Sequence, residues 1–173
     1  TASLLRQLAD GNLDVVLMAL PYKTEKVEVF EFADDPFLIV FPRGHELGKF
    51  ETLTPARLNN EALLALEEGN CLTDQTLAMG NLSERVERSQ FHASSLHTLV
   101  QMVDNGLGLT ILPKMAVDAG ILRGLKLNFR PFSSPKASRH IALVWRKTSR
   151  REDEFRMLGQ RLRDELGTPV PKI

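Results

Sequence analysis

The feature that most constrains the fold is a series of short apolar runs separated by segments of a different pattern. Residues 13–20 (LDVVLMAL) are nearly continuous apolar chain, which is typical of a strand buried on both faces of a parallel sheet. Further strands are expected at residues 27–32, 36–41, 62–66, 88–92, 107–113, 125–129 and 141–145. Because helix-like segments alternate with these runs, the sequence predicts an α/β fold with a mainly parallel sheet.

Helix signals occur at the expected places between the strands. Thr1 or Ser3 can cap a first helix that ends at Asp10-Gly11. The pair Ser94-Ser95 precedes apolar residues spaced i, i+3, i+4 and i+7, which predicts a helix ending at Asn105-Gly106. Residues 115–119 predict a short helix, and residues 150–166 predict a final amphipathic helix.

Cys71 is the only cysteine among the 173 residues. It lies where the apolar run 63–66 gives way to a predicted helix at 72–79, so the thiol is expected at a helix N-terminus. The helix dipole and the outward N–H groups favour an anion there and bias the thiol toward thiolate. The alternative is a half-buried cysteine that packs as a small apolar side chain. One cysteine excludes an internal disulfide and is compatible with a reducing compartment.

Charge and composition exclude several classes of function. Acidic and basic residues number 22 each, and this neutral balance argues against a nucleic-acid-binding surface on this chain. No apolar run approaches 18 residues and no signal-peptide pattern opens the chain, so no membrane association is expected. The four histidines lack zinc-site spacing, and Gly106-x-Gly108 is too short for a dinucleotide motif. We therefore expect no metal and no cofactor. The chain starts with Thr1 and is expected to be a fragment.

Three motifs resemble the LysR-type transcriptional regulators. Residues 7–16 (QLADGNLDVV) resemble their L-x-x-G-x-L-D junction. Residues 94–103 (SSLHTLVQMV), followed by residues 106–113 (GLGLTILP), resemble their V-x-x-G-x-G-[IL]-x-[LI]-L-P element. Residues 67–75 (EEGNCLTDQ) are similar to the pattern E-D-G-H-C-L-x-D-Q of the hydrogen-peroxide-sensing OxyR group. The similarity covers nearly the whole chain.

The resemblance implies a periplasmic-binding-protein-like fold of type 2, with two Rossmann-like lobes joined by two crossover strands. Lobe I would be residues 1–34 plus 139–173, and lobe II would be residues 35–138. The crossovers are expected near residues 34–37 and 138–141, with a ligand cleft between the lobes. The DNA-binding winged helix-turn-helix of the family is expected upstream, outside this chain.

The resemblance also implies a site. Cys71 matches the peroxidatic cysteine, Thr1 matches a threonine that holds peroxide, and Arg139 matches a basic residue near the cysteine pocket. Asp74 matches the family aspartate, although a simpler role is partnership with the helix dipole. The expected ligand-binding residues are Thr1, Asn70, Asp74, Gln90, Ser95 and Arg139.

Departures from the family pattern leave alternatives open. The resolving cysteine is replaced by Gly80, and two histidines are replaced by Asn70 and Gln90. His92 and His97 are expected at the surface. Either Cys71 would then act alone, through a sulfenic acid or a mixed disulfide, or this protein would sense something else.

The expected function is the regulatory domain of a LysR-type transcription activator that senses peroxide or oxidative stress through Cys71. It would be cytoplasmic, form a homodimer or homotetramer, contact DNA through the upstream domain, and not be an enzyme. The alternatives are a sensor of a small organic metabolite in the inter-lobe cleft, a solute-binding protein, and a cysteine peroxidase.

Overall fold

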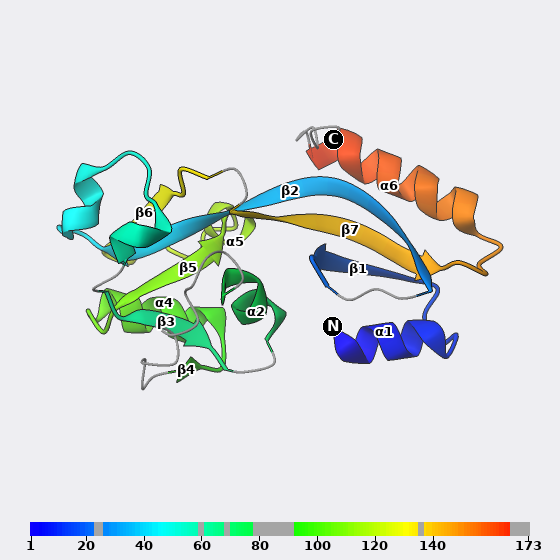
Figure 1. Cartoon of the computed structure of the whole chain (residues 1–173), viewed down its shortest axis with the longest axis horizontal. Coiled ribbons are helices and arrows are strands. Elements are labelled where there is room, and N and C mark those ends of the chain that lie inside the picture. The colour runs from blue at the N-terminus through cyan, green and yellow to red at the C-terminus, as the bar shows by residue number, and fades with distance from the viewer. Residues whose placement is uncertain (23–25, 59–60, 68–69, 78–91, 135–136, 167–173) are drawn as a thin grey trace. The chain divides into compact units, whose positions relative to one another are not determined.

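The computed structural model describes residues 1–22, 26–58, 61–67, 70–77, 92–134 and 137–166. Contacts divide the chain into two compact units: unit 1 is Thr1–Asp35 with Arg139–Ile173, and unit 2 is Pro36–Ser138. Figure 1 labels the helices and strands. In chain order they are α1 (Ala2–Ala9), β1 (Val15–Leu20), β2 (Val27–Pro42), the 3-10 helices η1 (Glu46–Lys49) and η2 (Pro55–Leu58), β3 (Leu63–Leu66), α2 (Cys71–Leu77), β4 (His92–Ala93), α4 (Leu96–Asp104), β5 (Leu109–Pro113), α5 (Lys114–Asp118), β6 (Leu127–Pro131), β7 (Ser138–Arg146) and α6 (Glu152–Leu166).

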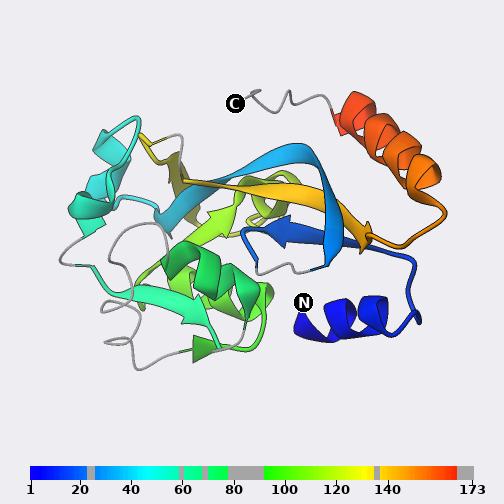
Figure 2. The same ribbon diagram turned by 45° about the vertical axis from the view of Figure 1, so that its right-hand side comes forward.

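Unit 1 is a small sheet covered on both faces by helices. Strand β7 lies between β1 and β2, and β1 runs antiparallel to β7 from the pair Val15–Trp145 to the pair Leu20–His140. Helices α1 and α6 lie on opposite sides of these strands (Figures 1 and 2). Because side chains alternate along a strand, β7 contributes to two apolar clusters. One contains Leu8, Val16, Met18, Leu20, Ala142 and Val144, and the other contains Phe32, Ala33, Ile141, Leu143, Trp145 and Phe155.

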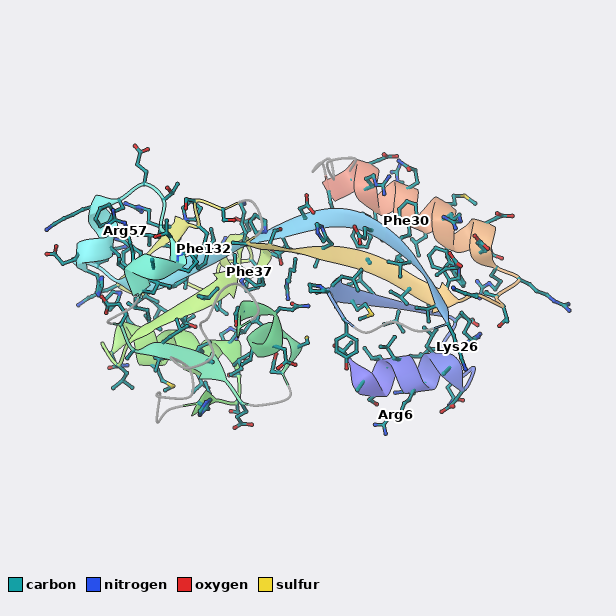
Figure 3. All side chains as sticks on the ribbon, viewed as in Figure 1. Arg6, Lys26, Phe30, Phe37, Arg57 and Phe132 are labelled. Atoms are coloured by element: carbon teal, nitrogen blue, oxygen red, sulfur yellow. The ribbon has the colours of Figure 1, made fainter. Side chains whose placement is uncertain are left out.

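Helix α6 approaches β2 closely at a glycine. Gly159 lies against the ring of Phe30, and a Cβ at this position would be nearer to that ring than real Cβ atoms come to other atoms. Figure 3 shows Phe30 between α6 and the strands. The guanidinium of Arg163, one turn further along α6, lies 4.5 Å from the centroid of the same ring. Glycine at 159 therefore sets how closely this helix packs.

The sheet of unit 2 is mixed, so the expectation of a mainly parallel sheet is wrong. Its strand order is β2-β5-β3-β4, and β6 also pairs with β2. Strand β2 is antiparallel to both β5 and β6, whereas β3 is parallel to β4 and β5. A continuous apolar run indicates burial on both faces of a strand, but it carries no information on the direction of the neighbouring strand.

A second correction concerns the segments 27–32 and 36–41, which form one continuous strand, β2, rather than two. Pro36 lies inside it. Its missing N–H is tolerated because pairing with β5 begins only at Phe37 and pairing with β6 begins at Leu38. The proline thus lies where β2 passes from the pairings of unit 1 to those of unit 2.

The core of unit 2 joins its strands to α4. The buried face of α4 consists of Leu99, Val100 and Val103, as its spacing predicts, and Phe37 and Phe132 pack in the same cluster (Figure 3). Of the expected strand at 88–92, only His92 falls within the described residues, as the start of β4. In the described part of the chain, no helix has the length and apolar character needed to cross a membrane.

Candidate functional site

The candidate site lies in unit 2, at the carboxyl ends of its parallel strands. Strands β3 and β4 are paired through Leu66 and Ala93, and the N–H of Glu67 donates to the carbonyl of Ala93 at 3.1 Å. Helix α2 follows β3, helix α4 follows β4, and helix α5 follows the parallel strand β5. Because neighbouring parallel strands end at the same edge, α2 and α4 both begin there. Open α/β sheets bind ligands at this edge.

Cys71 is the first residue of α2, with a free and half-buried thiol. This confirms the expected position at a strand-to-helix junction. The preceding residue, Asn70, fixes the start of the helix: its Oδ1 accepts a hydrogen bond from the N–H of Leu72 at 3.1 Å, and its carbonyl accepts from the N–H of Asp74 at 3.2 Å. Asn70 is therefore the N-terminal cap of the helix that carries the thiol.

The inner side of α2 is largely polar. Leu72, Thr73, Gln75 and Thr76 are buried, whereas Asp74 is exposed. The hydroxyl of Thr73 donates to the carbonyl of Leu66 at 3.2 Å, which ties the helix directly to the end of β3. Asp74 lies in the first turn, where a carboxylate interacts favourably with the helix dipole, and its role toward a ligand stays a prediction.

Ser95 caps the second helix at this edge. Its Oγ accepts a hydrogen bond from the N–H of Thr98 at 3.1 Å and lies 3.0 Å from the Thr98 hydroxyl. The side chains of His92 and His97 are exposed on either side, as expected from the sequence. The structure thus brings Asn70, Cys71 and Ser95 to one edge of the sheet. Gln90 and Gly80 lie outside the described residues.

Two further expected site residues, Thr1 and Arg139, belong to unit 1. Thr1 is at the N-cap position of α1 with no side-chain capping bond, and its carbonyl accepts from the N–H of Leu5 at 3.1 Å. Arg139 pairs with Asp35: its Nε and Nη2 each lie 2.9 Å from Asp35 Oδ2. The sequence reading missed Asp35. The available signal was the acidic pair Asp34-Asp35 in one crossover segment and the basic residues at 139–140 in the other.

The described residues contain no group of three or more His, Cys, Asp or Glu side chains arranged to hold a metal ion. The candidate edge offers a thiol, an amide, hydroxyls, the carboxylate of Asp74 and the N–H groups of two helix starts.

Comparisons with known proteins identify the family. The family model described as the LysR substrate binding domain matches residues 1–167. A probable hydrogen peroxide-inducible genes activator from Mycobacterium avium is 38% identical over 160 residues, which are 92% of this chain and 51% of that protein. This chain spans about half the length of the curated relatives it matches.

Solved structures agree with this match. The regulatory domain of a variant of OxyR2 from Vibrio vulnificus has a TM-score of 0.82 and 38% identity, covering 95% of this chain and 79% of that one. A hydrogen-peroxide-bound, cysteine-to-serine variant of Corynebacterium glutamicum OxyR has a TM-score of 0.84 and 29% identity, covering 99% of this chain and 57% of that one. These matches confirm the expected periplasmic-binding-protein-like α/β fold.

The matching proteins are transcription regulators and not enzymes. The family model covers nearly the whole described chain, and the structural matches cover both units. The chain therefore belongs to the LysR substrate-binding domain family.

Proposed function

We propose that this chain is the sensing part of a LysR-type transcription activator and that it detects hydrogen peroxide by oxidation of Cys71. One observation carries the proposal: the only cysteine of the sequence is a half-buried free thiol at the first residue of α2, at the carboxyl edge of the parallel strands. The relatives named as hydrogen peroxide-inducible genes activators, and the peroxide-bound OxyR structure, support this assignment.

The chemistry is a two-electron oxidation of the thiol. The Cys71 thiolate attacks one peroxide oxygen, the S–O bond forms and the O–O bond breaks, giving a sulfenic acid and a hydroxide that takes up a proton to become water. Backbone N–H groups at the starts of α2 and α4 are suited to stabilise the leaving hydroxide. In this proposal the ligand-binding residues are Thr1, Asn70, Asp74, Gln90, Ser95 and Arg139.

The fate of the sulfenic acid follows from the cysteine count. Since the sequence holds one cysteine, this chain cannot form an intramolecular disulfide. The oxidised state would be the sulfenic acid itself or a mixed disulfide with a small external thiol such as glutathione. Reduction by a second external thiol would restore Cys71 and release a disulfide.

The response would pass through an oligomer to DNA. We propose a cytoplasmic homodimer or homotetramer whose DNA contacts are made by a domain outside this chain, in keeping with the neutral charge found here. Oxidation can act only by favouring one arrangement of the oligomer over another by a few kcal/mol.

The test is transcription from a target promoter with and without hydrogen peroxide, using the full-length regulator and its Cys71→Ser variant. The proposal requires the variant to bind DNA normally and to lose the peroxide response. A peroxide response that survives in Cys71→Ser would refute it, whereas a response to a metabolite that survives in the variant would favour a metabolite sensor. Sustained peroxide consumption by the wild-type protein with an external thiol would favour a cysteine peroxidase instead.

A further inference from the structure

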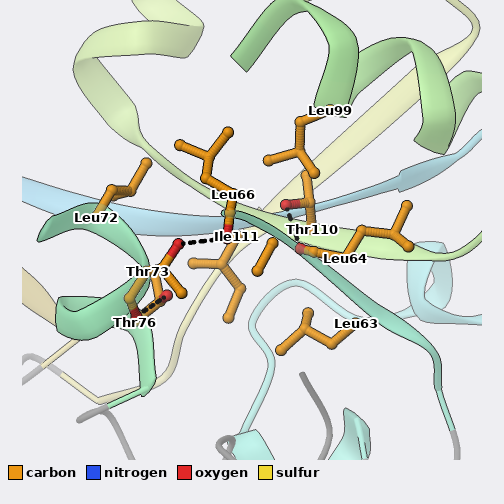
Figure 4. A pocket seen from close by; sticks show the side chains of 10 residues that line it. Leu63, Leu64, Leu66, Leu72, Thr73, Thr76, Leu99, Thr110 and Ile111 are labelled. Carbon is orange, nitrogen blue, oxygen red and sulfur yellow. Dashed lines mark hydrogen bonds between the residues drawn. The ribbon is translucent and has the colours of Figure 1, made fainter. Parts of the chain in front are cut away.

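Unit 2 contains a small cavity directly beneath the helix that carries Cys71. Its volume is about 10 Å³, and it lies among α2, α4, β3 and β5 (Figure 4). Seven of the lining residues are apolar: Leu63, Leu64, Ala65, Leu66, Leu72, Leu99 and Ile111. The other three are threonines, Thr73 and Thr76 on α2 and Thr110 on β5. Figure 4 shows the threonine side chains and their hydrogen bonds.

The hydroxyl protons of all three threonines are already used in hydrogen bonds to backbone carbonyls. Each hydroxyl donates to a backbone carbonyl: Thr73 to Leu66 at 3.2 Å, Thr76 to Thr73 at 2.8 Å, and Thr110 to Leu64 at 3.0 Å. A carbonyl oxygen can only accept, and a hydroxyl has one proton and two lone pairs. The threonine oxygens can therefore offer only lone pairs to a molecule in the cavity.

This pattern selects the occupant by charge and by size. An anion has no proton to donate and would meet only acceptor oxygens, so the cavity disfavours it. A volume of about 10 Å³ is near the minimum that holds one water molecule, and no organic metabolite fits. The occupant that suits this lining is a neutral, water-sized donor of two hydrogen bonds.

We propose that the cavity is a binding site for one structural water, which donates to at least two of the three threonine oxygens. A water that donates to Thr110 and to one threonine of α2 would join the inner face of α2 to the sheet by hydrogen bonds. A branched apolar residue in place of Thr73 or Thr76 would offer this water no acceptor oxygen. The contact between helix α2 and the other residues that line the cavity would then include a water molecule and would not be wholly apolar.

The experiment is a high-resolution crystal structure of the protein with three variants. Thr76→Val and the double variant Thr73→Val with Thr76→Val replace hydroxyls by methyl groups of similar size, and Thr76→Ser is the matched control that keeps a hydroxyl. We expect one isolated oxygen peak in the cavity of the wild type and of Thr76→Ser. We expect no such peak in the double variant.

Two results would overturn the proposal. One is a water that persists in the double variant, because the threonine oxygens of α2 would then not hold it. The other is a wild-type structure at high resolution with no oxygen peak in the cavity, because the cavity would then be dry. This second result needs only the wild-type protein, so it decides the question even if the valine variants fail to fold.

Discussion

Asp35 and Arg139 form a buried ion pair in unit 1, with Nε and Nη2 of Arg139 each 2.9 Å from the same carboxylate oxygen. Asp35 has no exposed surface, and the Arg139 side chain is 16% exposed. The next residues repeat the arrangement, since His140 Nδ1 lies 2.6 Å from Asp34 Oδ1. Two acidic residues of β2 thus face two basic residues of β7 where both strands pass from unit 1 to unit 2.

Replacing Asp35 by Asn should strongly destabilise the protein. The substitution keeps the shape of the side chain but removes the carboxylate charge that pairs with the largely buried Arg139, and breaking such a pair costs about 3–5 kcal/mol. Urea unfolding can measure the free energy through the fluorescence of the only tryptophan, Trp145, which is buried and 5.7 Å from the ring of Phe155.

Asp118→Asn is the matched control, because it removes a carboxylate from an exposed ion pair with Lys114 at 2.6 Å. An exposed pair contributes under about 1 kcal/mol. Equal losses of unfolding free energy in the two variants would show that the pair of Asp35 with Arg139 contributes no more to stability than an exposed pair does.

Arg146 should stabilise the connection between α1 and β1. Its Nη1 lies 2.5 Å from the carbonyl oxygens of both Leu8 and Leu13, and its Nη2 lies 3.4 Å from Asp14 Oδ1. Lysine carries the same charge but lacks the planar guanidinium group, whose several N–H donors have a fixed geometry. We expect Arg146→Lys to lower the free energy of unfolding by about 1–3 kcal/mol, measured by urea unfolding. Arg161→Lys, at an exposed ion pair on α6, is the control and should change little. A loss as small as the control's would contradict this role.

Gly159→Ala should destabilise the protein although alanine favours helices. The helix preference gains about 1 kcal/mol, but the new methyl group would overlap the ring of Phe30, and such overpacking costs about 1–3 kcal/mol. Thermal unfolding of the single variant and of the double variant with Phe30→Leu would test this. The smaller leucine should recover part of the loss. In the control Gly48→Ala, the nearest atom to the new Cβ is Phe41 Cε2 at 3.8 Å, an ordinary contact. A stabilised Gly159→Ala variant would refute the packing argument.

Local signals in the sequence predicted most of the elements. Helix α4 is an example, because its cap at Ser95 and its apolar spacing are contained within ten residues. Strand direction and strand continuity were predicted wrongly, since both depend on partners far along the chain. Pro36 looked like the start of a new strand, although it lies inside β2 at a position outside the β5 and β6 pairings.

The candidate site and the residues linked to it also contain features that could be predicted from neighbouring residues and features that could not. The junction at Cys71 and the cap at Ser95 follow from neighbouring residues and could be predicted. The partner of Arg139, Asp35, and the cavity residue Thr110 could not, because each acts through a residue far away in sequence: Asp35 pairs with Arg139, and Thr110 donates to Leu64. Those pairings depend on strand register, which the sequence pattern did not specify.

The side chain of Asn70 should stabilise the first turn of α2. Asn70→Ala removes the hydrogen bond from Leu72 N–H to the Asn70 side chain, and loss of such a cap costs about 1 kcal/mol. Hydrogen exchange of amides in α2 should therefore become about fivefold faster. Asn70→Ser, which keeps a capping oxygen, is the control and should stay near the wild-type rate. Unchanged exchange in Asn70→Ala would mean that the cap does not govern opening of this helix.

The central claim, that Cys71 is a one-cysteine peroxide sensor, is tested most directly by intact-mass spectrometry after near-stoichiometric hydrogen peroxide. A trapping reagent for sulfenic acid identifies the product, and Cys71→Ser is the control. We expect rapid addition of one oxygen to the wild-type chain at Cys71 and none to the variant. A wild-type thiol that reacts only with a large excess of peroxide would contradict the claim, and Cys71 would then be a structural residue.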